Sequence, residues 1–150
     1  MTTALFPGTF RPFTRGHAAI VQRALRLFDH VVIGIGYNAE KPEAADIDAR
    51  VADIARLYET VPQVTVRAYH GLTTDCAAEV GADCLLRGVR SVKDFEYERD
   101  IADINRQLSG LETIILISEP QYAAISSSLV RELQHYGKDV TSLLPSHDQL

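Results

Sequence analysis

The sequence contains no tryptophan and only two cysteines, and it lacks a long apolar run. Cys76 and Cys84 have no histidine at metal-ligand spacing, so we expect reduced structural thiols rather than a disulfide framework or a metal site. No segment approaches the roughly 18 apolar residues that span a membrane, and the opening "MTTALF" does not have the pattern of a signal peptide. These absences predict a cytoplasmic location and no membrane partner.

Positive charge is also in short supply. The chain has 15 lysines and arginines against 20 aspartates and glutamates, which gives a net charge of -5. General binding to nucleic acid needs a basic face that displaces counterions from the phosphates, so we expect no nucleic-acid partner. A local basic pocket for a small anionic ligand stays compatible with this balance.

Five short runs rich in β-branched residues predict strands at residues 3–6, 30–36, 64–69, 84–88 and 112–117. The length of 150 residues fits a single domain over residues 1–150. Because helical patterns separate the strands, we predict an α/β fold: a Rossmann-like doubly wound domain with a five-stranded parallel sheet.

Four segments between or after these strands place apolar residues on one helical face. The faces consist of Ile20, Val21, Ala24, Leu27 and Phe28; of Ile47, Val51, Ile54, Ala55 and Tyr58; of Ile101, Ile104 and Leu108; and of Leu129, Val130 and Leu133.

Ligands of such sheets bind beyond the carboxyl ends of the strands, so the segments that follow each strand are the candidate site. "GIGYNA", residues 34–39, formally matches the dinucleotide-binding pattern. Pro42 follows it, however, and the next helical pattern begins only near Asp46, so no helix opens within the glycines. We therefore do not predict a dinucleotide site there.

The loop after the first strand combines Gly8 and Thr9 with Gly16 and His17, where the first helix begins. Gly8 permits close backbone approach, and free backbone N–H groups at a helix N-terminus favour an anion. The alternative is that both glycines only shape a turn and that His17 is a surface or capping residue.

The segments after the fourth and fifth strands offer further phosphate ligands. Arg87 and Arg90 are three residues apart, and the planar guanidinium group suits phosphate oxygens. They can instead pair with the acidic residues Asp94, Glu96 and Glu98, and both roles are compatible because those acids would hold the arginines in place. Residues 125–128, "ISSS", predict a helix N-cap with more serines than one cap needs.

Three motifs in order, "PGTF(x)P(x)T(x)GH", "RG(x)R(x3)DFEYE" and "ISSSLV(x)E", make the chain similar to bacterial phosphopantetheine adenylyltransferases. That family lies in the nucleotidyltransferase superfamily with a (H/T)-x-G-H motif, which is residues 14–17 here. The resemblance runs from Ala4 to about Pro145, and "RGVRSVKDFEYE" is its most specific part.

The resemblance implies one nucleotidyltransferase domain that transfers AMP from ATP to 4'-phosphopantetheine, giving dephospho-coenzyme A and pyrophosphate. This is the penultimate step of coenzyme A synthesis, and it proceeds by direct in-line attack of the acceptor phosphate. The implied cofactor is Mg²⁺ bound with ATP, no metal ligand is assigned to the chain, and the implied assembly is a homohexamer.

The resemblance also assigns site residues. His17, Thr9, Lys41 and Arg90 form the catalytic set, and Thr9, Lys41, Thr73 and Arg87 bind the acceptor. The ATP-binding set is Thr9, Phe10, His17, Gly88, Val89, Arg90, Glu98, Tyr122, Ala123, Ala124, Ile125, Ser126, Ser127 and Ser128. A phosphate monoester is already largely ionised near neutral pH, so His17 is expected to stabilise the transition state rather than to accept a proton.

The chain departs from the family pattern at several positions. Arg11 stands where relatives usually have aspartate, Arg15 adds a second cation, and "EAADIDA" at residues 43–49 differs from the usual lead-in to the second helix. The run 122–124 is smaller than the aromatic-Ser-Phe sequence often found there. Two alternatives therefore stay open: transfer to another phosphorylated acceptor, such as nicotinate mononucleotide or glycerol 3-phosphate, or a non-catalytic nucleotide-binding relative.

Overall fold

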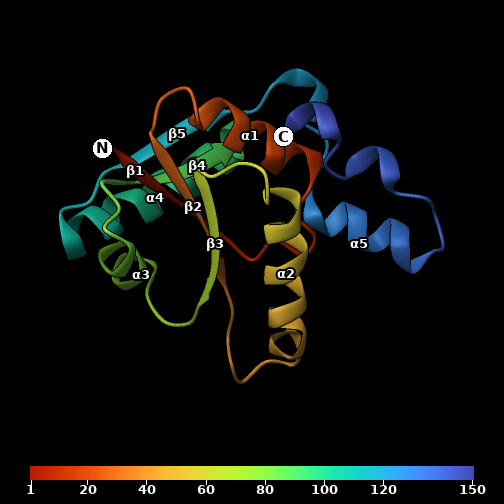
Figure 1. The fold of residues 1–150 in the computed structure, drawn as a ribbon, viewed down its shortest axis with the longest axis horizontal. Coiled ribbons are helices and arrows are strands. Elements are labelled where there is room, and N and C mark those ends of the chain that lie inside the picture. Colours follow the sequence, from red (N-terminus) through yellow and green to blue (C-terminus); the bar gives the residue numbers. More distant parts are fainter.

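The computed structural model describes residues 1–150, and five parallel strands form its single sheet (Figure 1). The strands are β1 (Thr3–Gly8), β2 (His30–Gly36), β3 (Val64–Tyr69), β4 (Cys84–Val89) and β5 (Thr113–Ile117). Each lies within two residues of a strand predicted from sequence. The predicted α/β fold with a five-stranded parallel sheet is confirmed.

Five α-helices and four short 3-10 helices connect or follow the strands. The α-helices are α1 (Arg15–Ala24), α2 (Ile47–Leu57), α3 (Thr73–Val80), α4 (Val92–Ser109) and α5 (Ser127–His135). The 3-10 helices are η1 (Pro42–Asp46), η2 (Pro120–Tyr122), η3 (Thr141–Leu143) and η4 (His147–Gln149). None of the helices has the length and apolar character that would let it cross a membrane.

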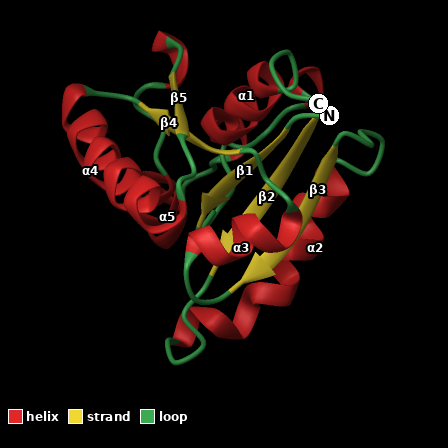
Figure 2. Ribbon diagram, turned by 90° about the vertical axis from the view of Figure 1, so that its left-hand side faces the viewer, coloured by secondary structure: helices red, strands yellow, loops and turns green.

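Helices cover both faces of the sheet (Figure 2). Successive strand residues point to opposite faces, and the two faces have separate cores. Phe6 and Ile33 belong to the larger core, which includes residues of α1 and α2. Leu5 and Val32 belong to the smaller one, which includes Cys76 of α3. The doubly wound arrangement thus follows from apolar residues at consecutive strand positions.

The strand order β3-β2-β1-β4-β5 changes direction between β1 and β4. These two strands pair at only two positions, Ala4 with Cys84 and Leu5 with Leu85, although both continue toward their carboxyl ends. Beyond Leu5 the backbone ladder between them stops, and the Arg87 guanidinium group donates to the carbonyl of Pro7 instead. A parallel sheet places its ligand site at such a switch point.

Two predicted helical faces are only partly correct. The first helix ends at Ala24, because the next turn tightens as Leu27 and Phe28 both donate to the Ala24 carbonyl. Phe28 still packs on the core, but Leu27 is exposed. In the second helix Ala55 is exposed, whereas Ile54 and Tyr58 are buried.

The third predicted face, on α4, is largely exposed: Ile104 and Leu108 keep more than half of their surface accessible. The structure also contains a helix that the sequence patterns did not indicate. Helix α3 is short and rich in small residues, and it buries only Thr74, Cys76 and Ala77, so its apolar periodicity is weak.

The glycines of "GIGYNA" have a packing role. A Cβ atom at Gly34 would lie 2.9 Å from Leu5 and 3.2 Å from the Tyr69 ring, and one at Gly36 would lie 3.1 Å from the Tyr69 hydroxyl. β2 ends at Gly36 and the next helical residue is Pro42, so no helix begins within these glycines. The decision against a dinucleotide site is consistent with this geometry.

Candidate active site

Two cavities open at the carboxyl ends of the strands. The large cavity, of about 600 Å³, lies among the segments that follow β1, β2 and β3 and the inner face of α4. The small cavity, of about 220 Å³, lies between the start of α1, the end of β4 and the segment before α5. Pro7, Gly8, Thr9 and Arg87 line both. The cavities therefore meet at the gap between β1 and β4.

The loop between β1 and α1 folds around the ring of Phe10, which is buried. A Cβ atom at Gly8 would lie 2.8 Å from that ring, so Gly8 is required by Phe10 itself. Gly8 also lines both cavities, so its predicted close backbone approach to a ligand stays a prediction. Phe10 also has a positive φ of 48°, a conformation that costs a non-glycine residue about 1 kcal/mol or more.

Three donors hold the carbonyl groups of this loop. Arg50 Nη1 donates to the Thr9 carbonyl over 2.7 Å, Arg131 Nη1 to the Arg11 carbonyl over 2.6 Å, and Ser127 Oγ to the Pro12 carbonyl over 2.8 Å. Arg50 comes from α2, whereas Arg131 and Ser127 come from α5. These contacts hold the loop from two sides through its carbonyl groups, so they do not use the backbone N–H groups of Thr9 and Phe10.

His17 takes part in a capping box at the start of α1. The backbone N–H of Thr14 donates to Nδ1 of His17 over 2.9 Å, and the backbone N–H of His17 donates to Oγ1 of Thr14. Because a backbone N–H can only donate, Nδ1 carries no proton and the neutral ring is protonated at Nε2. The capping role proposed as the alternative is real, and it fixes the tautomer that a ligand would meet.

The surroundings of His17 keep its ring neutral. Burial, together with the positive charges of Arg87 and Arg90, lowers the pKa of His17 to about 3, and burial has the largest effect. The centroids of the Phe10 and Phe13 rings lie 4.9 Å and 5.4 Å from that of the imidazole. At neutral pH His17 is therefore a hydrogen-bond donor through Nε2 and carries no charge.

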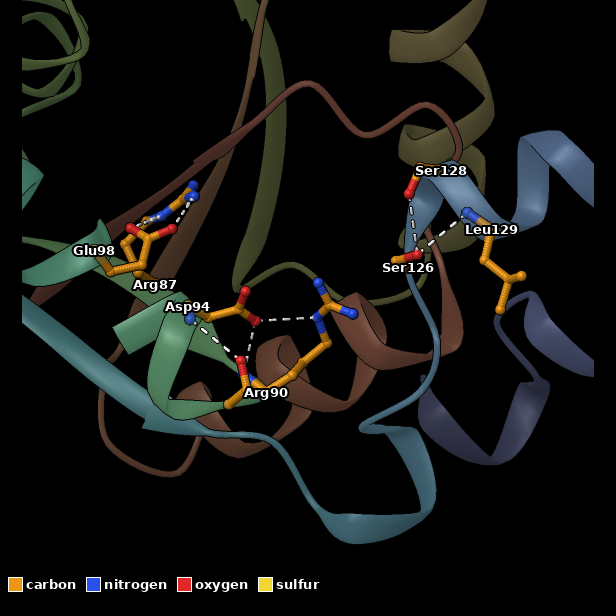
Figure 3. Close-up of polar contacts among 8 residues, drawn as sticks. Arg87, Arg90, Asp94, Glu98, Ser126, Ser128 and Leu129 are labelled. Atoms are coloured by element: carbon orange, nitrogen blue, oxygen red, sulfur yellow. Dashed lines mark hydrogen bonds and ion pairs between the residues drawn. The ribbon is translucent and has the colours of Figure 1, made fainter. Parts of the chain in front are cut away.

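Arg87 is held in place by a buried carboxylate. Its Nε donates to Oε2 of Glu98 over 2.8 Å and its Nη2 to Oε1 over 2.6 Å, a bidentate pair drawn in Figure 3. The side chain of Glu98 is only 7% exposed, whereas that of Arg87 is 30% exposed. Two of the five N–H groups of Arg87 stay free after these contacts and the bond to Pro7.

Arg90, Ser126 and Ser127 line the small cavity, and Figure 3 shows the polar contacts of Arg90 and Ser126. Arg90 Nε lies 3.3 Å from Oδ2 of Asp94, so the sequence alternative of arginine–acid pairing is confirmed for Arg90 as for Arg87. Ser126 Oγ accepts from the backbone N–H of Leu129 over 3.1 Å, which confirms the predicted N-cap of α5. The first N–H groups of α5 have no partner within the helix.

The large cavity is the more cationic of the two. Five basic side chains line it, against the two carboxylates of Glu43 and Glu98: Arg11, Lys41, Arg50, Arg87 and Arg131. Lys41 is exposed and forms no ion pair. Thr73, the first residue of α3, shares a hydrogen bond of 2.8 Å with the Tyr69 hydroxyl. This cavity suits an anionic ligand longer than a phosphate alone.

The structure brings most predicted site residues together. Lys41, Thr73, Arg87 and Thr9 line the large cavity, and Thr9, Phe10, His17, Arg87, Gly88, Arg90, Tyr122, Ile125, Ser126 and Ser127 line the small one. Val89, Ala123, Ala124 and Ser128 line neither cavity. Glu98 lines the large cavity beside Arg87 and does not line the small one, so its contact with ATP stays a prediction.

Several lining residues had no role assigned from the sequence: Arg50, Arg131, Glu43 and Asn105. All four lie on or just before helices, where a polar residue normally faces solvent. In the structure Arg50 stands out by its burial, because its side chain is only 10% exposed. Arg15, an unexplained cation of the first loop, donates to the Leu144 carbonyl and so holds the C-terminal segment rather than a ligand.

Comparison with known proteins identifies the family of the chain. The profile of the cytidylyltransferase-like family matches residues 5–133, so the chain belongs to this family of nucleotidyltransferases. A phosphopantetheine adenylyltransferase of Phocaeicola vulgatus is 52% identical over 145 residues, covering 97% of this chain and 96% of the relative. One from Bacteroides fragilis is 50% identical, covering 97% of each chain. Within the class, the chain is a member of the phosphopantetheine adenylyltransferase family.

Solved structures of more distant proteins share the fold. A bifunctional NMN adenylyltransferase/ADP ribose pyrophosphatase from Francisella tularensis, complexed with AMP and a manganese ion, superimposes with a TM-score of 0.71 at 13% identity. The match covers 97% of this chain but only 44% of that one. A putative nicotinate-nucleotide adenylyltransferase from Vibrio parahaemolyticus gives a TM-score of 0.60 at 16% identity and covers 99% of this chain.

Proposed function

We propose that the chain transfers AMP from ATP to 4'-phosphopantetheine, with ATP in the small cavity and the acceptor in the large one. The observation that carries this proposal is the junction of the two cavities at Thr9 and Arg87. Two anionic substrates that react with one another need separate sites with a shared boundary, and the family of the chain catalyses such a reaction. The products are dephospho-coenzyme A and pyrophosphate.

The reaction needs position more than acid–base chemistry. An oxygen of the acceptor phosphate attacks the α-phosphorus of ATP, a new P–O bond forms, and the bond from the α-phosphorus to the bridging oxygen breaks as pyrophosphate leaves. The second pKa of a phosphate monoester is about 6, so the nucleophile is already ionised at neutral pH. The protein must therefore hold two anions in line against their repulsion.

His17 supplies a donor for the charge that develops at the α-phosphate. Nδ1 accepts from the Thr14 backbone, so the proton is at Nε2, and the ring stays neutral while it donates. A donor fixed before the reaction needs no reorganisation when charge develops, and one such donor typically contributes about a hundred- to a thousandfold in rate. A general base would need a free ring nitrogen, and the capping box occupies it.

Helix N-termini and hydroxyl groups hold the nucleotide in this proposal. The small cavity is lined by residues at the start of α1 and α5, by Arg90 and by no carboxylate. Mg²⁺ prefers oxygen ligands and keeps much of its water, and no cluster of three His, Cys, Asp or Glu side chains could hold it here. We therefore propose that Mg²⁺ arrives as the ATP complex, bound by the phosphates, and that it offsets their charge.

Lys41 and Arg87 hold the acceptor phosphate, and Thr73 lies farther along the large cavity at the pantetheine arm. Lys41 has no protein partner, so its ammonium group can turn to a phosphate freely. Arg87 is fixed by Glu98 and offers its remaining N–H groups. The Lys41 side chain is therefore unpaired, and the Arg87 side chain is held in place by the protein.

We also propose that the chain assembles into a homo-oligomer, a hexamer by resemblance, and works in the cytoplasm. Helix α4 and strand β5 expose large apolar side chains, among them Val92, Tyr97, Leu108 and Ile117, each more than 60% accessible. A partner copy would cover exposed apolar side chains of this kind. Both cysteines are free thiols, as a reducing compartment requires.

The test is pyrophosphate release from ATP and Mg²⁺ with each of three acceptors: 4'-phosphopantetheine, nicotinate mononucleotide and glycerol 3-phosphate. We expect release with 4'-phosphopantetheine alone, and a second product that contains AMP joined to the acceptor. Release with another acceptor would reassign the substrate. Intact ATP binding without release for any acceptor would instead support a non-catalytic nucleotide-binding protein.

A further inference from the structure

Two of the departures from the family pattern lie against one another in the structure. Nη1 of Arg11, in the loop after β1, is 3.8 Å from Oε1 of Glu43, in helix η1. They are 32 positions apart in the sequence, and both line the large cavity. Arg11, the cation that departs from the family pattern, therefore has a carboxylate of another segment beside it.

Glu43 depends on Arg11 for its charge balance. The other carboxylate oxygen, Oε2, is buried and accepts no hydrogen bond, and Arg11 is the only cation within 4.0 Å of the group. An enclosed carboxylate oxygen that accepts no hydrogen bond is costly, because the protein does not replace its lost hydration. The pair is therefore more than a chance surface contact, although both side chains are partly accessible.

The same two segments are joined a second time by Arg50. Its Nη1 donates to the Thr9 carbonyl, its Nη2 donates to the Glu43 carbonyl over 2.9 Å, and its Nε bonds Asp46. Lys41 directly precedes η1, and Thr9 lies two residues before Arg11. Arg50 and the pair thus join the segments that carry two expected ligands of the acceptor phosphate.

We propose that Arg11 and Glu43 form a positioning pair that sets Thr9 and Lys41 around the acceptor phosphate. The proposal rests on the proposed function of the large cavity. Neither side chain contacts the reacting atoms in it: Arg11 neutralises Glu43, and Glu43 holds η1 and hence Lys41 against the loop.

A competing idea is that Arg11 itself binds the acceptor phosphate. Glu43 would then compete with the phosphate for Arg11, and its neutralisation would improve acceptor binding. If the pair positions Lys41, neutralisation must weaken acceptor binding. The two ideas therefore predict opposite changes in acceptor binding when Glu43 is neutralised.

The experiment measures kcat and the two KM values for the full-length chain and four variants: E43Q, R11D, the exchange R11D/E43R and the control R56D. For E43Q we expect KM for 4'-phosphopantetheine to rise about threefold, and for R11D, which faces Glu43 with a second carboxylate, about tenfold. KM for ATP and kcat should change less than twofold. The exchange should recover most of the R11D loss.

The control matches the charge change outside the cavities. Arg56 is exposed on α2 and pairs with Asp53, so R56D also places two carboxylates together. We expect wild-type constants for it. A lower KM for the acceptor in E43Q, or an exchange variant no better than R11D, would overturn the positioning pair.

Failure of the proposed function gives a different result. If the wild-type chain does not transfer AMP to 4'-phosphopantetheine, the proposed function is wrong, and the positioning pair is wrong with it because the large cavity then binds no acceptor phosphate. If the wild type transfers AMP and R11D retains the wild-type KM for the acceptor, only the pair is wrong. Circular dichroism and a thermal melt of each variant exclude loss of folding as the cause.

Discussion

The large and the small cavity both suit phosphate groups, but they do so by different physical means. The large cavity has five basic side chains, three of which are tied to carboxylates: Arg87 to Glu98, Arg11 to Glu43 and Arg50 to Asp46. The small cavity has the N-termini of two helices, hydroxyl groups, one neutral histidine and Arg90 with Arg87 at its edge. One therefore depends on paired charges and the other on backbone dipoles.

This difference suits the ligands that each cavity is proposed to take. A side-chain cation can turn toward the terminal phosphate of a flexible ligand. An arginine that is held by a carboxylate is already oriented, so it needs little movement to bind that phosphate. A helix N-terminus cannot move independently of the core, so it suits the phosphate at which bonds form and break. We expect the two cavities to respond differently to substitution.

Removal of the His17 imidazole should have the largest effect, on rate. We expect His17→Ala to lower kcat by about a hundred- to a thousandfold, because a fixed donor to the developing charge is lost. ATP binding should stay within a few fold, because Arg90 and the helix termini remain. Steady-state pyrophosphate release and calorimetric ATP binding measure the two effects. Near-normal turnover would remove His17 from the mechanism and the rate function from the small cavity.

Removal of Arg87 should act on the large cavity and on stability. Arg87→Ala leaves Glu98 buried without its partner, which should lower the free energy of unfolding by about 3 kcal/mol. KM for the acceptor should also rise. In the matched variant R87M/E98M the free energy of unfolding should recover while the acceptor KM does not. If both recover together, Arg87 is only a structural residue.

Acidification should destabilise the fold through His17. The pKa of His17 is about 3 in the folded chain and about 6.5 when unfolded, so below pH 6.5 the unfolded chain binds the extra proton. The free energy of unfolding should therefore fall by about 2 kcal/mol between pH 7 and pH 5 from this group.

His17→Gln is the matched control for that measurement, because glutamine can accept from the Thr14 backbone and does not titrate. Urea unfolding at both pH values should show a smaller loss for this variant. Equal losses in the two proteins would mean that folding does not lower the pKa of His17 and that the small cavity accepts a charge at pH 5.

The smallest expected effect is that of a helix cap. Ser126→Ala removes the acceptor for the Leu129 N–H and should lower the free energy of unfolding by about 1 kcal/mol. Ser128→Ala is the comparison, since the hydroxyl of Ser128 contacts only that of Ser126. Equal effects of the two substitutions in a urea titration would argue against a rigid α5 N-terminus at the small cavity.

Sequence patterns predicted most of the fold because buried parallel strands are short apolar runs. Such a run can be recognised without knowing which strand it pairs with. They failed where burial is slight. Helix α3 has few apolar residues, and Ile104 and Leu108 of α4 have the spacing of a buried face although they are exposed in the single chain. Periodicity shows that a face is apolar, but it does not show what covers it.

The site divides in a similar way. Motifs located Thr9, His17, Arg87 and Arg90, since each stands at a fixed distance from a strand end or a helix start. No motif located Arg50 or Arg131, because an arginine on a helix resembles a solvated charge until its contact with a distant carbonyl is known. The tautomer of His17 was likewise visible only from the hydrogen bond to Thr14.

By itself, the sequence determined the sheet, the family and the chemical kind of most site residues, because these depend on local spacing and residue type. Only the tertiary structure decided how the charges are balanced. In the sequence, the positive charge of Arg11 at a position where relatives usually have aspartate has no explanation. In the structure, Arg11 faces Glu43. A charge is neutralised by whatever lies within a few ångströms, and the path of the fold, not the order of the sequence, sets that distance.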